Sequence, residues 1–179
     1  LDDAALMAKL GFAGQHPEGR FLPETYLYTR GDSDLDVLAR AHEAMRKALD
    51  AAWKTRAPGL PLASQDQALV LASIVEKETG VAEDRPRIAG VFVNRLARGM
   101  RLETDPTVVY GLGTRYDGNI RKKDLQADNP YYTYRLAGLP PTPISMPGRA
   151  ALQAVVHPAA GDALCFVSTG DGSVRVLFA

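Results

Sequence analysis

Residues 69–80 read Leu69-Val70-Leu71-Ala72-Ser73-Ile74-Val75-Glu76-Lys77-Glu78-Thr79-Gly80, and the fold depends on this stretch. Positions 67–75 carry no charge, and two carboxylates follow directly where that run ends. Ser64 or Asp66 can cap the start of a helix and Gly80 can end or loosen it, so the pattern predicts a helix. Because nearly every interior position is apolar, most faces of this helix should be covered by protein.

The two acids at the end of this helix cannot face one cleft together. At about 100° per residue, Glu76 and Glu78 point about 200° apart. Glu78 continues a line of apolar side chains, whereas the line of Glu76 turns polar at Glu83, and Lys77 lies between them on the solvent side. Apolar surroundings raise the proton affinity of a carboxyl group, so Glu78 is the better candidate for a desolvated acid. The alternative is a buried helix whose polar last turn emerges into water.

Composition predicts one packed domain and gives no support to nucleic-acid binding. Of 179 residues, 46% are hydrophobic, and 21 Lys plus Arg balance 21 Asp plus Glu. Cys165 is the single cysteine, so an internal disulfide is excluded, and its apolar neighbours predict a buried, inert thiol. No segment reaches the roughly 18 apolar residues that cross a bilayer.

Hydrophobic periodicity predicts a helix-rich α+β fold. The helical pattern covers residues 2–10, a long segment from Asp34 to about Arg56, residues 87–98 and residues 149–156. In the long helix Trp53 should serve packing, and His42 should lie at the surface or boundary. Extended segments are expected at 21–28 and 100–106, a mostly irregular loop at 114–148, and a hairpin from 164–168 and 174–178 across 170–172.

The sequence lacks several motifs that are typical of cofactor-binding and metal-binding sites. It has no glycine-rich phosphate loop, no cysteine pair and no His-x-x-x-His spacing, so neither a cofactor nor a metal is expected. Sugar-compatible side chains are plentiful, because tyrosine rings stack on the apolar faces of sugars while Asp, Asn and Arg bond hydroxyls. The candidates for substrate binding are Asn94, Asp105, Thr107, Tyr110, Tyr131 and Tyr134. Taken singly each has a structural alternative, such as a turn at Asp105 or a core position for Tyr110.

Four blocks of sequence then resemble one family. Residues 71–79 read LASIVEKET, 91–96 read VFVNRL, 100–111 read MRLETDPTVVYG and 138–144 read GLPPTPI. Together they resemble the YceG-like (MltG) endolytic murein transglycosylases, and the resemblance covers nearly all of the chain. The chain departs from that family at Tyr132, where an Asn is usual, and after Ser173, where a His-x-Phe segment, Glu-His-Asn and a last helix are usual.

The resemblance implies an anchored enzyme of the cell wall. Such proteins are held in the inner membrane by one N-terminal helix and act in the periplasm on peptidoglycan glycan strands. Residues 1–179 would then be the catalytic domain, with a LysM-like subdomain and the anchor upstream and a truncated C-terminal end. Penicillin-binding proteins or other wall synthases are the expected partners. The catalytic glutamate of the family falls on Glu78, in a lysozyme-like active-site helix.

The implied chemistry needs only one carboxyl group. A protonated Glu78 would protonate the glycosidic oxygen between MurNAc and GlcNAc, and the C6 hydroxyl of the same MurNAc would close a 1,6-anhydro ring. A glycoside hydrolase would instead need a second carboxylate, for which Asp105 or Glu103 is available. A non-catalytic glycan-binding module of the wall-synthesis machinery is the third hypothesis.

Overall fold

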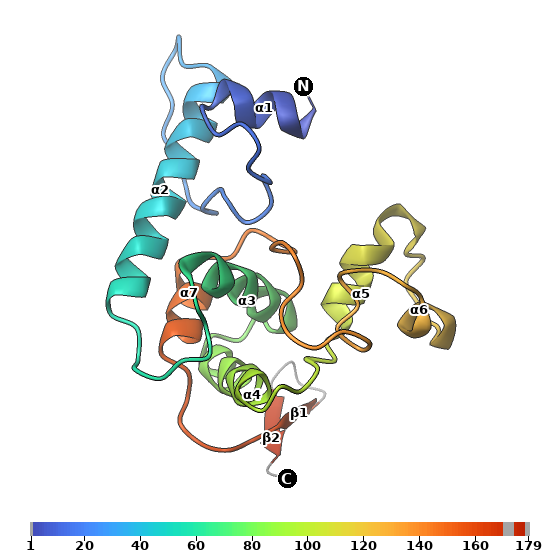
Figure 1. The fold of residues 1–179 in the computed structure, drawn as a ribbon. Helices are drawn as coiled ribbons and strands as arrows, with labels where there is room; N and C mark the ends of the chain where they lie inside the picture. Colours follow the sequence, from blue (N-terminus) through green and yellow to red (C-terminus); the bar gives the residue numbers. More distant parts are fainter. Residues whose placement is uncertain (1, 170–173, 178–179) are drawn as a thin grey trace.

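The computed structural model describes residues 2–169 and 174–177. Seven α-helices form the framework of the described chain (Figure 1): α1 (Asp3–Lys9), α2 (Asp34–Lys54), α3 (Gln65–Glu78), α4 (Arg85–Ala97), α5 (Asp105–Leu112), α6 (Lys122–Gln126) and α7 (Arg149–Val156). Two short 3-10 turns, η1 (Ala82–Asp84) and η2 (Gly113–Arg115), flank α4 and α5. None of the helices in the described part of the chain is long and apolar enough to cross a membrane.

The predicted hairpin is confirmed. Strands β1 (Cys165–Ser168) and β2 (Val174–Leu177) pair antiparallel, with Cys165 opposite Leu177 and Ser168 opposite Val174. Its expected turn at 170–172 and its last residue, Phe178, lie outside the described residues. The fold is therefore α+β in composition, with a helical body and one small two-stranded sheet.

Helix α3 lies in the middle of the helical body, with α7 and α4 against it (Figure 1). Ser64 caps its first turn by accepting a hydrogen bond from the Gln67 N–H at 3.2 Å. Every residue from Ala68 to Val75 is buried, as the uncharged sequence predicts. Burying a large aliphatic or aromatic side chain contributes about 1.5–3 kcal/mol to the free energy of unfolding, so the buried face of α3 makes a large contribution to stability.

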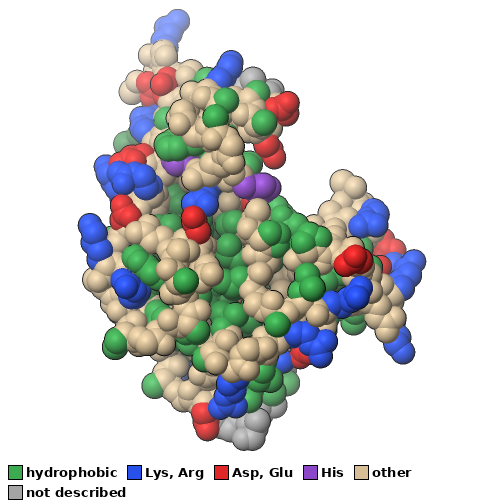
Figure 2. Space-filling view, in the orientation of Figure 1, with side chains coloured by type: hydrophobic (Ala, Val, Ile, Leu, Met, Phe, Trp, Pro, Cys, Tyr) green, Lys and Arg blue, Asp and Glu red, His purple; other side chains and the backbone are tan. Residues whose placement is uncertain are grey.

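In the space-filling view, apolar side chains gather over the middle of one face, with charged ones toward its margins (Figure 2).

Helix α2 joins the N-terminal part to this body. A capping box between Ser33 and Asp36 fixes its start, and its inner face is buried. Trp53 packs against the core, with the Arg56 guanidinium 4.2 Å from its ring centroid. The expectation for His42 was wrong, because this residue is 5% exposed and its ring is stacked on Phe12 at 3.7 Å. The N-terminal segment folds back over α2, a tertiary contact that periodicity within α2 cannot reveal.

The segment after α4 differs from its prediction. Residues 105–112 form helix α5, where an extended lead to residue 106 was expected. Pro106 falls in the first turn, where its missing N–H costs no hydrogen bond, so the proline starts the helix. The loop at 114–148 also holds the short helix α6, and no strand is assigned within 21–28.

Tyr132, one of the two departures from the family pattern, is a core side chain. It is 1% exposed and packs with Val108 and Leu112 of α5. A Cβ atom on Gly111 would lie 2.5 Å from the Tyr132 Cε1 atom, so the glycine makes room for this ring. The large side chain at 132 therefore depends on the small residue at 111.

Candidate active site

A pocket of about 260 Å³ opens where α3 ends, between α4, the start of α5 and β1. Its wall contains five acidic or hydroxyl side chains and a pair of phenylalanine rings in contact: Glu78, Glu103, Thr104, Asp105 and Tyr134, then Phe92 and Phe166, with Arg95, Leu102 and Cys165 completing it. Cys165 is exposed in this wall, so the prediction of a buried thiol was wrong. In a short strand on the surface, an apolar neighbourhood in sequence does not mean burial.

Glu78 is the last residue of α3 and its side chain is half-buried. Burial raises the pKa of its carboxyl group, the Thr104 hydrogen bond lowers it, and the nearby Asp105 charge raises it. The net effect on the Glu78 pKa is upward, because desolvation of the charged form is the largest of the three. A carboxyl group in this setting can hold a proton that an exposed one would have lost.

Thr104 holds one oxygen of Glu78. Its hydroxyl donates to Glu78 Oε1, which makes Oε1 the accepting, carbonyl-type oxygen. When the carboxyl group is protonated, the proton therefore sits on Oε2. This hydrogen bond leaves Oε2 as the Glu78 oxygen that is free to carry a proton.

A closed ring of hydrogen bonds fixes Thr104 in turn. Its N–H donates to Thr133 Oγ1 at 3.1 Å, and its carbonyl accepts from Thr107 Oγ1 at 2.8 Å. The Thr107 and Thr133 hydroxyls lie 2.9 Å apart, and since the Thr107 proton is already used, Thr133 donates to Thr107. All three threonines are buried, so the directions of the Thr107 and Thr133 hydroxyls are determined by this ring rather than by water, and the Thr104 hydroxyl is left to bond Glu78.

Glu103 adopts a left-handed backbone conformation beside this ring, with φ 53°. This region is uncommon for residues with a Cβ and must be held by surrounding contacts. Arg95 supplies them: its Nη2 lies 2.6 Å from Glu103 Oε2, while Nε and Nη1 donate to the carbonyls of Arg101 and Leu164. One guanidinium thus joins α4, the pocket wall and the lead into β1.

Asp105 and Tyr134 form a pair at the pocket rim. The Tyr134 hydroxyl donates to Asp105 Oδ1 at 2.7 Å. Burial first, and then the neighbouring Asp105 carboxylate, raise the pKa of the Tyr134 phenol, so it remains a donor. Of the six predicted substrate-binding residues, these two line the pocket with Glu78.

The other four predicted residues lie elsewhere. Asn94 donates to the carbonyls of Gly161 and Ala163 and lines a separate small pocket, which gives it a role in holding the chain before β1. Thr107 is fully buried in the threonine ring. It therefore supports the site from behind.

Tyr110 and Tyr131 pack beside each other, with ring centroids 4.9 Å apart. The Tyr110 hydroxyl donates to Glu18 Oε2 at 3.3 Å, and the Tyr131 and Thr142 hydroxyls are 2.8 Å apart. Burial and the Glu18 charge raise the pKa of Tyr110 to about 12. Neither ring is in the wall of the Glu78 pocket.

Glu76 has a structural partner on the other side of α3. Its Oε2 accepts from the Gly148 N–H at 2.9 Å, and its Oε1 lies 3.6 Å from Arg85 Nη2. Although the line of residues that Glu76 continues turns polar at Glu83, Glu76 is therefore bound within the fold and is not directed into water. Lys77 is exposed, as expected, and Glu76 holds the N-terminus of α7.

Comparison with known proteins identifies the family of this chain. A model of the YceG-like family matches residues 2–179. The chain belongs to the YceG-like family. Two relatives named endolytic murein transglycosylase come from Bacillus subtilis (36% identical over 161 residues, 89% of this chain and 44% of that protein) and Streptococcus pneumoniae D39 (32% over 157 residues, 84% and 28%).

A crystal structure of a yceG-like protein from Listeria monocytogenes has the same fold. It superposes with a TM-score of 0.75 at 34% identity, covering 97% of this chain and 60% of that one. The present YceG-like chain spans less than half the length of the relatives from Bacillus and Streptococcus.

Sequence reasoning missed two polar residues of the YceG-like pocket, Thr104 and Arg95, and the Thr133 side chain that supports Thr104 from behind. Thr104 and Arg95 lie inside the quoted blocks, but a threonine or arginine in a motif does not reveal which atom it will contact. No metal site adds to the pocket, because no cluster of His, Cys, Asp or Glu within residues 2–169 and 174–177 could hold an ion.

Proposed function

We propose that this chain is the catalytic part of an endolytic peptidoglycan lytic transglycosylase, with Glu78 as its acid and base. One observation carries the proposal: a half-buried carboxyl group with a raised pKa ends the central helix in a polar pocket, and Thr104 holds one of its oxygens. The printed names of the relatives from Bacillus and Streptococcus support the same reaction.

In the first step Glu78 acts as a general acid. The proton on Oε2 passes to the glycosidic oxygen between MurNAc C1 and the following GlcNAc, and the C1–O bond breaks. The GlcNAc leaves with a free hydroxyl, and Glu78 is left as a carboxylate. The Thr104 hydrogen bond to Oε1 stabilises that negative charge, since charge-assisted hydrogen bonds are the stronger kind.

In the second step the carboxylate acts as a base. It removes the proton of the C6 hydroxyl of the same MurNAc, and O6 bonds to C1 to close the 1,6-anhydro ring. Glu78 regains its proton and the cycle is complete. Because the nucleophile is tethered to the reacting sugar, effective molarity replaces a positioned water.

The second candidate function is a glycoside hydrolase, because Asp105 lines the same pocket as Glu78 and could supply the second carboxylate. With Asp105 as the second carboxylate, water would replace O6 and the product would be a reducing end. A third candidate is a glycan-binding module that cleaves nothing. The polar pocket around a carboxyl group with raised pKa favours an enzyme over this module.

The deciding experiment is digestion of purified glycan strands, followed by mass spectrometry of the products. A transglycosylase yields 1,6-anhydro-MurNAc ends, which are one water lighter than reducing ends. Glu78→Gln should yield neither. Reducing ends from the wild type would establish the hydrolase, and intact strands would establish the binding module.

The resemblance in sequence supports further parts of the proposal. Helix α3, buried from Ala68 to Val75 and with Glu78 at the pocket, would be lysozyme-like in its role. The natural protein would be anchored in the inner membrane by one N-terminal helix, with this domain in the periplasm beside penicillin-binding proteins or other wall synthases. Fractionation of cells that express the full gene tests the location, and recovery only in the cytosol would refute it.

A further inference from the structure

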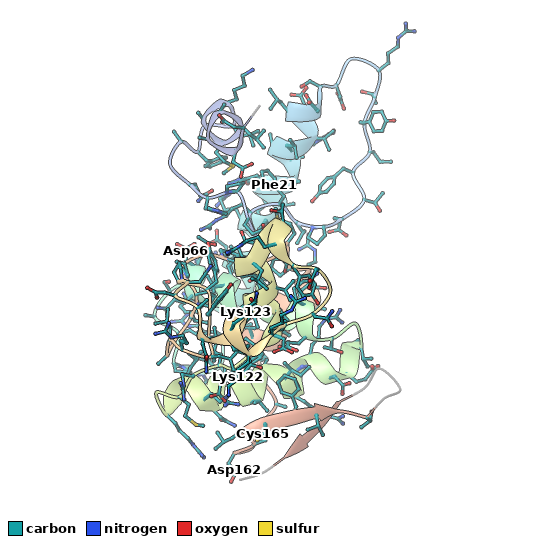
Figure 3. The ribbon with its side chains drawn as sticks, turned by 90° about the vertical axis from the view of Figure 1, so that its right-hand side faces the viewer. Phe21, Asp66, Lys122, Lys123, Asp162 and Cys165 are labelled. Carbon is teal, nitrogen blue, oxygen red and sulfur yellow. The ribbon has the colours of Figure 1, made fainter. Side chains whose placement is uncertain are left out.

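The β1–β2 hairpin forms one wall of the Glu78 pocket, and this wall has no role so far. Strand β1 contributes Cys165 and Phe166 to the lining, and both strands lie against α4. Figure 3 shows the hairpin directly below α4, with Asp162 and Cys165 labelled near its start. The hairpin wall differs in chemistry from the polar wall that residues 103–105 and Tyr134 form.

Helix α4 fixes the chain just before β1. The Asn94 side-chain amide donates to the Ala163 carbonyl at 2.9 Å, and Arg95 Nη1 donates to the Leu164 carbonyl at 3.0 Å. The Ala163 and Leu164 side chains are buried, each 7% exposed. These contacts hold the start of β1 in place without using the Phe166 ring.

Phe166 is a partly exposed ring in the hairpin wall. It meets the Phe92 ring at right angles, with an interplanar angle of 89° and centroids 5.7 Å apart. Phe92 is only 1% exposed, so Phe166 is the one of the two rings that solvent and substrate can reach. Val167, the next residue along the strand, is 46% exposed and lies outside the wall. Phe166 thus presents apolar carbon to a pocket whose other wall is polar.

A sugar ring matches this combination of walls. A pyranose carries hydroxyl groups around its edge, and a β-linked one carries axial C–H groups on a face that is apolar. The carboxylates and hydroxyls of the polar wall suit the edge. The π face of an aromatic ring carries partial negative charge and attracts the slightly positive C–H hydrogens of the apolar face.

We propose that Phe166 is a substrate-binding residue, whose ring stacks on the C–H face of a sugar bound beside Glu78. The choice of a sugar rests on the proposed function. Phe92 and the bonded start of β1 hold the ring before substrate arrives, so binding costs little side-chain entropy. The stacking is present both in the bound substrate and in the transition state, and it therefore lowers KM without raising kcat.

The test is the binding of a tetrasaccharide of alternating GlcNAc and MurNAc, measured by isothermal titration calorimetry. All proteins carry Glu78→Gln, so that the ligand stays intact. Phe166→Leu keeps an apolar side chain against Phe92 but removes the π face, and Kd should rise about threefold to tenfold. Phe166→Tyr keeps the ring and should stay within twofold. Val167→Ala, the matched control on the same strand, should also stay within twofold.

Two further measurements separate stacking from a role in packing alone. With Glu78 restored, Phe166→Leu should raise KM by the same factor and leave kcat within twofold. In the Glu78→Gln complex, nuclear Overhauser effects should connect the Phe166 ring protons to axial protons of the sugar, a result that does not depend on how Phe166→Leu folds. An unchanged Kd in Phe166→Leu, an equal loss in Val167→Ala, or no such effects in the saturated complex would overturn the proposal.

The result is separate from that for the proposed function. Binding that depends on Phe166, by a wild type that leaves long glycan strands intact, would refute the transglycosylase and keep the stacking residue. Cleavage to 1,6-anhydro ends with binding that is independent of Phe166 would keep the function and refute the stacking residue.

Discussion

Replacing Thr104 by valine removes the hydroxyl that donates to Glu78 and keeps the branched shape of the side chain. The backbone N–H and carbonyl of residue 104 remain, so the bonds to Thr133 and Thr107 can still form. The variant should therefore fold normally. What it loses is the fixed acceptor role of Glu78 Oε1 and the stabilisation of the carboxylate between the two steps.

The size of the loss follows from that single bond. A hydrogen bond to a charged group contributes about 1.5–3 kcal/mol. Since about 1.4 kcal/mol corresponds to a factor of ten, kcat/KM should fall about tenfold to a hundredfold. Thr104→Ser, which keeps the hydroxyl, should stay close to the wild type.

The pH profile gives a readout that misfolding would not imitate. The Thr104 bond lowers the pKa of Glu78, so its removal raises that pKa further. In the proposed mechanism cleavage begins from protonated Glu78, so activity should fall as the pH rises through its pKa. The alkaline limb of kcat/KM on glycan strands should therefore move to higher pH in Thr104→Val but not in Thr104→Ser. An unchanged limb and rate in Thr104→Val would refute the role assigned to this hydroxyl.

Three further predictions concern the two acids of α3 and need two variants, Glu78→Gln and Glu76→Gln. Glu78→Gln should lose about 10²–10⁴-fold in cleavage rate with its fold intact, and activity near that of the wild type would exclude Glu78 as the acid. Because burial raises the folded-state pKa of Glu78, its contribution to stability is present below the unfolded-state pKa and lost as the pH rises through the folded one. The Tm of Glu78→Gln should consequently gain on the wild type as the pH is raised, and a constant difference would contradict this. Glu76→Gln should keep most of its activity and lose about 1 kcal/mol of stability, or about 2–4 °C in Tm, through its weakened bond to Gly148 and lost pairing with Arg85. An inactive Glu76→Gln would show instead that Glu76 is the acid.

The central helix could be predicted from sequence because its own residues determine its burial. Positions 68–75 are apolar or small throughout, and a helix with no polar face must be covered on all sides. The angular argument also separated the environments of the two acids, since Glu78 meets the pocket and Glu76 the opposite side. It predicted the wrong neighbours for Glu76, because Gly148 and Arg85 come from distant segments.

The errors share this cause. Phe12 and Phe21 cover His42 from the N-terminal segment, at ring distances of 3.7 and 5.8 Å, and nothing within α2 indicates their approach. The prediction that Asn94 binds sugar rests on its chemistry alone, and in the fold its amide donates to the carbonyls of Gly161 and Ala163, which the sequence did not indicate. A motif identifies useful side chains, whereas only the tertiary fold decides which of them are already engaged.

The bond between Glu76 and Gly148 has a mechanical consequence for the other acid. Glu76 and Glu78 project in nearly opposite directions from one rigid helix, so any axial rotation of α3 would displace both carboxyl groups together. The contacts of Glu76 with Gly148, at the start of α7, and with Arg85 resist such a rotation. They thereby help to fix the direction in which the Glu78 side chain points. In the Glu-Lys-Glu sequence, the first acid thus positions the helix, and the second is the residue proposed to react.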